Sequence, residues 1–138
     1  MSDQNRLLCR ELSLLAFNRR VLAQAQDARV PLLERLRFLC IVSSNLDEFF
    51  EVRMAWLKRE QKLRPNSRLD NGKTPAETIA AVSAEAHAII QEQYALFNDE
   101  LQPALSREGI HFYRRRNWTP AQRAWIERYF DCELLPIL

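Results

Sequence analysis

A long stretch of helical apolar periodicity, opened by Thr74-Pro75-Ala76-Glu77, constrains the fold of this 138-residue chain most. Threonine is a preferred N-cap, proline is favoured at the first helical position, and a glutamate three residues after the cap can bond back to the cap amide. Apolar side chains then recur at three- and four-residue spacings from Ile79 to Leu101. The pattern predicts a helix from 75 to about 105, which needs partner helices to bury its apolar face.

Two shorter segments before it also predict helices. Ser13 is a preferred N-cap type and opens an apolar-periodic segment, which predicts a helix over about 13–26. Pro31 then starts a segment so densely apolar up to Val42 that its helix is expected to be buried on most sides.

The segment Ser43–Glu48 interrupts this apolar run with small polar residues followed by acidic ones. Asn45 is a preferred cap type, and Glu48 lies three residues later, where it can return a bond to the cap amide. We therefore expect a break or kink here, with a new helix running from Asn45 to about Leu63 and a surface loop over 64–73.

The C-terminal part repeats the same start signal after a stop. Gly109 ends the long helix, residues 110–113 are expected to form a short extended segment, and Thr119-Pro120-Ala121-Gln122 opens another short helix. The apolar end 134–138 looks cut rather than finished. The fold class expected is all-α: an antiparallel helical bundle with a long helix, plus a short strand-helix tail from about 109.

Composition narrows the function classes. The chain has 47% hydrophobic and 28% charged residues, and a net charge of +2 gives no field for capturing nucleic acid. Three widely spaced cysteines fit neither a disulfide framework nor a zinc motif, and they indicate a reducing compartment. Without a signal peptide at the start or an apolar run of ~20 residues, we expect a cytoplasmic protein.

Most residues that could take part in catalysis, metal binding or phosphate binding also have a structural explanation. His87 lies between Ala86 and Ala88, and His111 lies beside Phe112 and Tyr113; a structural role is favoured for both. No triad, P-loop or dinucleotide fingerprint is present. Among the acidic residues Asp47, Glu48 and Glu51, the first two are explained by a helix start, and Glu51 faces Ala55 at helical spacing and not a ligand type, so no metal site is expected. Arg114–Arg116 is favoured as a solvated edge, with a phosphate contact as the lesser alternative.

The candidate binding site is the polar break at Ser43-Ser44-Asn45. A helix start presents unpaired N–H groups, and the Asn45 amide can donate and accept, as a phosphate or nucleobase edge requires. A capped kink between two core helices explains the same residues without a ligand. From the residues alone, the structural interpretation is favoured.

Five segments of the chain closely resemble the N-terminal domain of bacterial polyphosphate kinase, of the long family that forms a phosphohistidine. They are Glu11-Leu12-Ser13, Phe17–Leu22, Pro31–Leu39, Ser43–Phe50 and Val52-Arg53. The resemblance is strong over 11–60 and extends by pattern over 75–138. It implies a helical N-terminal domain over 1–106 and a truncated start of the following head domain over 107–138.

The resemblance also implies a function. The family transfers the terminal phosphate of ATP reversibly to inorganic polyphosphate, using Mg²⁺ and a histidine in a distant C-terminal region. That region lies outside this sequence, so no catalytic residue or Mg²⁺ ligand is expected here, and the chain alone should be inactive. The Asn of the family's SSNLDEF motif contacts ATP, which makes Asn45 the expected ATP ligand, with Ser44 and Asp47 as pocket neighbours.

The partners implied are the remaining domains of the enzyme, polyphosphate and a second copy of the chain in a homo-oligomer. No nucleic acid is expected, and peripheral membrane association cannot be read from the sequence. Two alternatives stay open: a helical interaction module for domain or subunit docking, in which Asn45 serves only as a cap, and a stand-alone helical regulator.

Overall fold

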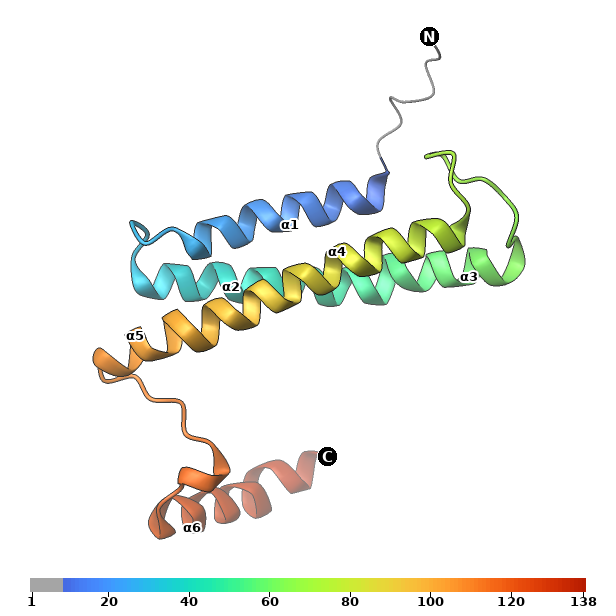
Figure 1. Ribbon diagram of the computed structural model, residues 1–138. Helices are drawn as coiled ribbons and strands as arrows, with labels where there is room; N and C mark the ends of the chain where they lie inside the picture. Colours follow the sequence, from blue (N-terminus) through green and yellow to red (C-terminus); the bar gives the residue numbers. More distant parts are fainter. Residues whose placement is uncertain (1–8) are drawn as a thin grey trace. The chain divides into compact units, whose positions relative to one another are not determined.

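The computed structural model describes residues 9–138, and it confirms an all-α chain (Figure 1). The first helices are α1 (Arg10–Gln26), α2 (Leu32–Glu48), the π-helical segment η2 (Phe49–Met54) and α3 (Ala55–Leu63). They are followed by α4 (Pro75–Ala95), the π-helical segment η3 (Leu96–Leu101) and α5 (Gln102–Arg107). The remainder holds the short η4 (Arg115–Asn117), α6 (Pro120–Tyr129), η5 (Phe130–Leu134) and η6 (Leu135–Ile137).

The chain divides into two compact units, one ending at Ala104 and the other formed by Leu105–Leu138. In the first unit, α2, η2 and α3 follow one another as a nearly continuous rod, antiparallel to both α1 and α4 (Figure 1). Helix α1 packs on α2 and α4, and α3 packs on α4. The antiparallel bundle predicted from apolar spacing is therefore confirmed, while the domain division at 106 and 107 stays a prediction.

The core of the first unit lies along helix stripes spaced by three and four residues, as predicted for amphipathic helices. The fully buried members are Leu15, Leu22 and Ala25 of α1, Val42 of α2, Leu57 of α3, Val82, Ala86 and Ile89 of α4, and Leu101 of η3. Four polar residues, Glu11, Asn18, Arg35 and Thr78, occupy buried positions on the same helices. Such residues are stable in a core only when their polar groups are hydrogen-bonded.

The break expected at 43–48 is wrong, because α2 runs through it without interruption. Asn45 is not an N-cap: its backbone carbonyl accepts from the Phe49 N–H, as in a helix interior. Serine and asparagine cost a helix interior only about 0.5 kcal/mol each. Burying Val42 and Leu46, which continue the apolar stripe on either side, contributes more than this. A π-helical segment, η2, follows instead of a new helix start.

The predicted helix starts have mixed outcomes. Helix α1 begins at Arg10, three residues before Ser13, whose hydroxyl donates to the Cys9 carbonyl instead of capping. Both Thr-Pro capping boxes are confirmed, since Thr74 accepts from the Glu77 N–H and Thr119 from the Gln122 N–H. The two boxes contain all their reciprocal partners locally, so sequence alone specifies them.

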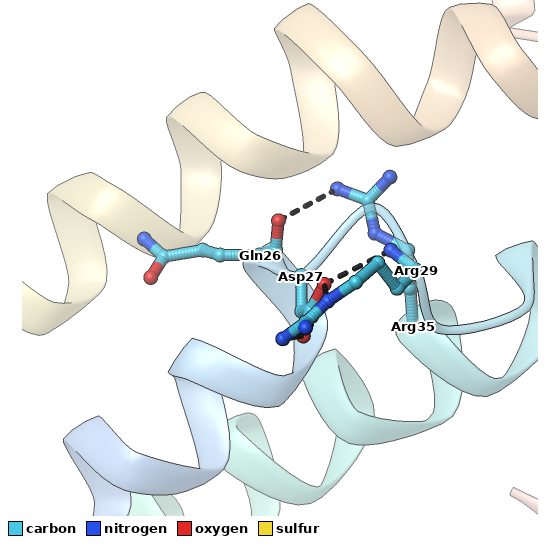
Figure 2. Close-up of polar contacts among 4 residues, drawn as sticks. All are labelled: Gln26, Asp27, Arg29 and Arg35. Carbon is cyan, nitrogen blue, oxygen red and sulfur yellow. Dashed lines mark hydrogen bonds and ion pairs between the residues drawn. The ribbon is translucent and has the colours of Figure 1, made fainter.

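Arg35 fixes the turn between α1 and α2. Its guanidinium donates to the carbonyl of Ala25 at 2.7 Å and to that of Gln26 at 3.5 Å, the second bond being drawn in Figure 2. These carbonyls lie at the C-terminal end of α1, where the intrahelical donors have run out and a cation is favoured. In the same turn, the Asp27 carboxylate binds the Arg29 guanidinium, and this hydrogen bonding lowers the pKa of Asp27 to about 2.

Near the start of the second unit, α5 ends at Arg107 and is followed by Gly109, which has a φ of 81°. The N–H of Gly109 donates to the Ser106 carbonyl and that of Ile110 to the Leu105 carbonyl, so two terminal carbonyls of α5 are satisfied. Residues 110–114 are irregular rather than a strand, since no extended segment within residues 9–138 pairs with them. Among the described helices, none is long and apolar enough to cross a membrane.

Candidate functional site

The candidate site is organised by a hydrogen bond between two asparagines on α1 and α2. Asn18 is 2% exposed, and its Nδ2 donates to the Val42 carbonyl at 3.1 Å. This bond fixes the orientation of the Asn18 amide. Its other end, the Oδ1 atom, accepts from the Nδ2 of Asn45 at 3.0 Å. Asn18 therefore sets the orientation of the Asn45 amide.

Asn45 itself is half-buried and keeps part of its hydrogen-bonding capacity. An asparagine amide carries two N–H donors and an acceptor oxygen, of which the bond to Asn18 uses one donor. Within residues 9–138, no group hydrogen-bonds to the Oδ1 of Asn45. The remaining donor and this oxygen form an oriented edge for a ligand.

The Asn45 amide borders a groove of about 190 Å³, which we call the asparagine groove. It is lined by Leu14, Leu15, Phe17 and Asn18 of α1, Asn45 and Glu48 of α2, and Phe49, Val52 and Arg53 of η2. Phe17 and Val52 are about half exposed, at 51% and 52%, so apolar surface flanks the polar edge. An apolar surface beside a few fixed polar groups is typical of small-molecule sites.

The structure does not bring all of the expected pocket residues into this groove. Ser44 and Asp47 are exposed on α2 and do not line it. Each successive residue of a helix turns by about 100°, so the immediate neighbour of Asn45 points elsewhere, while Glu48, three residues on, shares its face. The role of Ser44 and Asp47 as pocket neighbours stays a prediction.

Asn18 and Arg53 are groove residues that the sequence analysis did not single out. Asn18 occupies the apolar stripe that also holds Leu15 and Leu22, and a polar residue on such a stripe is the signal that could have marked it. Arg53 had no comparable signal, because its position depends on how η2 passes α1.

The groove is suited to binding rather than to covalent chemistry. Its polar groups are amides, a carboxylate and a guanidinium, with no hydroxyl or thiol nucleophile among its lining residues. Both histidines make local bonds, His87 with the Ser83 carbonyl and His111 with the Ser106 hydroxyl. In the part of the chain that the structure describes, no three His, Cys, Asp or Glu side chains are grouped to hold a metal. Arg114–Arg116 belongs to the second unit.

Comparisons with known proteins agree on one family. The family model described as the polyphosphate kinase N-terminal domain matches residues 7–113. A polyphosphate kinase of Neisseria meningitidis serogroup A is 77% identical, and one of Burkholderia multivorans is 49% identical, each over the whole chain. The crystal structure of polyphosphate kinase from Porphyromonas gingivalis matches with a TM-score of 0.74 at 29% identity, over 94% of this chain and 18% of that one.

The matches cover nearly all of this chain but a small part of each relative. The chain spans 20% of the length of the two curated relatives. The family model covers both the helices that build the asparagine groove and the long α4. This chain therefore belongs to the polyphosphate kinase N-terminal domain family.

Proposed function

We propose that this chain is the nucleotide-side domain of a polyphosphate kinase, and that it helps to bind ATP for reversible transfer of the terminal phosphate to inorganic polyphosphate. The observation that carries the proposal is the Asn45 amide, which Asn18 orients and which borders the asparagine groove. A side chain sealed inside the bundle would have had no route to a ligand, whereas Asn45 is half-buried.

The amide edge matches the hydrogen-bonding edge of adenine. Adenine presents an N6 amino donor beside the N7 acceptor, and asparagine meets this pair with its Oδ1 and Nδ2 atoms. Asn45 has both an Oδ1 and one Nδ2 hydrogen left for such a pair. The exposed apolar surface of Phe17 and Val52 suits the apolar faces of a base.

The size of the groove supports a shared site rather than a complete one. Ligand pockets commonly enclose roughly 300–1,000 Å³, whereas the asparagine groove has about 190 Å³. It can hold a base, and the rest of the nucleotide would then lie outside the groove. The chain alone should bind ATP weakly and should not transfer phosphate, since the groove carries no phosphoryl acceptor or metal-ligand cluster.

The test is Asn45→Ala in the polyphosphate kinase that carries this domain, with Asn98→Ala as the matched control. Asn98 is an exposed helical asparagine that donates to the Tyr94 carbonyl and does not line the groove. We expect Asn45→Ala to raise the KM for ATP about tenfold, as the loss of about 1.4 kcal/mol of binding energy would. The control should leave the KM unchanged.

An unchanged KM for ATP in Asn45→Ala, with a weakened subunit or domain association, would replace this proposal by the docking module. In that case, the exposed apolar residues Leu14, Phe17 and Val52 would serve as a protein contact instead of a base contact. A cytoplasmic location and a homo-oligomeric state remain predictions under either function.

A further inference from the structure

A second, larger cleft lies beside the asparagine groove in the first unit, and Arg53 lines both. Its volume is about 520 Å³. Its walls come from the start of α1, from one face of η2 and α3, and from the loop after α3. We call it the arginine cleft, because Arg10, Arg53, Arg64 and Arg68 all line it.

The four arginines of the cleft have no ion-pair partner among the described residues. Within residues 9–138, Arg10, Arg53, Arg64 and Arg68 form no ion pair. Arg68 donates to the Gly72 carbonyl at 2.6 Å, which holds its guanidinium beside the cleft without cancelling its charge. Fully buried arginines are usually paired; Arg53 is half-buried and has no ion-pair partner in the part of the chain that the structure describes.

The arginines are spread along the cleft and not stacked at one point. Arg53, Trp56, Glu60 and Arg64 follow one another at spacings of three, four and four, which places them in a row on one helix face. Arg53 and Arg64 stand at the two ends of this row, roughly 16 Å apart at a rise of 1.5 Å per residue. A ligand that meets both ends must carry several anionic groups along its length.

Three carboxylates also line the cleft, and they limit which anions fit. Glu11 is buried at 8% exposure and contacts the Cys9 thiol, while Glu60 and Asp70 complete the set. The lining carries four arginines and three carboxylates, which gives a net charge of +1. The overall electrostatic field of the cleft is therefore too weak to select one anion over another. Selection would come from individual guanidinium forks, which match phosphate oxygens in a bidentate manner.

We infer that the arginine cleft binds a linear phosphate chain through Arg10, Arg53 and Arg64, in addition to the base site at Asn45. The chain can be inorganic oligophosphate, or it can be the triphosphate of a nucleotide whose base occupies the asparagine groove, because Arg53 lines both sites. The inference rests on the proposed function in one respect only, namely which molecule carries the phosphate chain.

The test is isothermal titration calorimetry of the 138-residue chain with inorganic tripolyphosphate at low ionic strength. We compare Arg10→Gln/Arg64→Gln with the control Arg59→Gln/Lys62→Gln. The control removes the same two charges from exposed positions on α3 outside the cleft. Charge-assisted hydrogen bonds are roughly twice as strong as neutral ones, so the cleft variant should weaken binding at least about tenfold. The control should change it less than about twofold.

Absence of tripolyphosphate binding, or equal weakening in the cleft variant and the control, would overturn the inference. A comparison of ATP with tripolyphosphate shows whether the phosphate chain comes from a nucleotide or from inorganic phosphate. If ATP binds more tightly than tripolyphosphate and Asn45→Ala removes that advantage, the cleft takes the phosphates of a nucleotide. If tripolyphosphate binds equally well with or without Asn45→Ala and ATP shows no advantage, the cleft takes inorganic phosphate chains. The KM test of Asn45→Ala changes neither Arg10 nor Arg64. The proposed function and the inference about the arginine cleft can therefore fail independently.

Discussion

The Nδ2 atom of Asn45 lies 3.0 Å from the Oδ1 atom of Asn18, on the neighbouring helix α1. Asn18 is buried, and the same side chain donates to the Val42 carbonyl of α2. One asparagine in the core thus joins two helices and directs the amide of a second asparagine at the surface. This pair is both a packing element and the orienting part of the proposed nucleotide contact.

A double-mutant cycle on Asn18→Ala and Asn45→Ala should give a coupling of about 1 kcal/mol in the free energy of unfolding. Asn45→Ala leaves a buried acceptor on Asn18 without its donor, whereas in the Asn18→Ala background that acceptor is already gone. Urea denaturation followed by circular dichroism measures the four proteins. Additive effects would show that the two amides do not interact in solution.

Removing Arg35 should destabilise the first unit far more than removing its acidic partner. Arg35→Met keeps the apolar stem but leaves the Ala25 carbonyl without its charged donor, so we expect a loss of about 2–3 kcal/mol. Glu100→Gln removes an ion pair whose carboxylate side chain is 60% exposed, and such pairs contribute about 0–1 kcal/mol. Urea midpoints compare the variants, and equal losses would place the stabilisation in the ion pair instead.

The two capping boxes should respond differently to the same substitution. Thr74→Ala should lower the free energy of unfolding of the first unit by about 1 kcal/mol, because α4 contributes buried residues to the core. Thr119→Ala should leave that unfolding unchanged, since α6 has no buried residue and belongs to the second unit. Its effect should be local: amide exchange near Gln122 should accelerate about fivefold, which NMR would detect.

Acid should weaken the turn between α1 and α2 through Asp27. Its hydrogen bonds from Arg29 lower its pKa from 3.8 to about 2, so the native state favours the charged carboxylate. The stabilisation is therefore fully present above pH 3.8 and is lost as the pH falls to about 2. The stability difference between the wild type and Asp27→Asn should shrink over this interval. A difference that stays constant down to pH 2 would contradict the assignment.

Much of the helical architecture could be predicted from the sequence, since its determinants are local. The Thr74 and Thr119 boxes hold their reciprocal partners within three residues, and the apolar stripes repeat at helical spacing. Gly109 ends its helix in a conformation that favours glycine. Ser13 and Asn45 have cap-forming side chains as well, but neither serves as a cap, because burial of the flanking apolar residues extends the helix past each one.

The candidate site was only partly accessible from the sequence. Asn45 was identified from its polar break and from the resemblance to a family, and it borders the groove. Ser44 and Asp47 are close to it in sequence but do not line the groove, whereas Asn18 and Arg53 line it from α1 and η2. Sequence neighbours share a helix, but not a face of it.

By itself, the sequence determined the helices, their apolar faces and the starts and stops that lie within a few residues of one another, because these depend on short-range hydrogen bonds and on periodicity. Only the tertiary structure decided that α2 continues through Asn45, that Asn18 orients the Asn45 amide, and that arginines from α1, η2 and the end of α3 line one cleft. These features depend on which helix faces meet. That choice is made by packing of the whole bundle, in which burial of apolar surface outweighs local preferences of about 0.5 kcal/mol per residue.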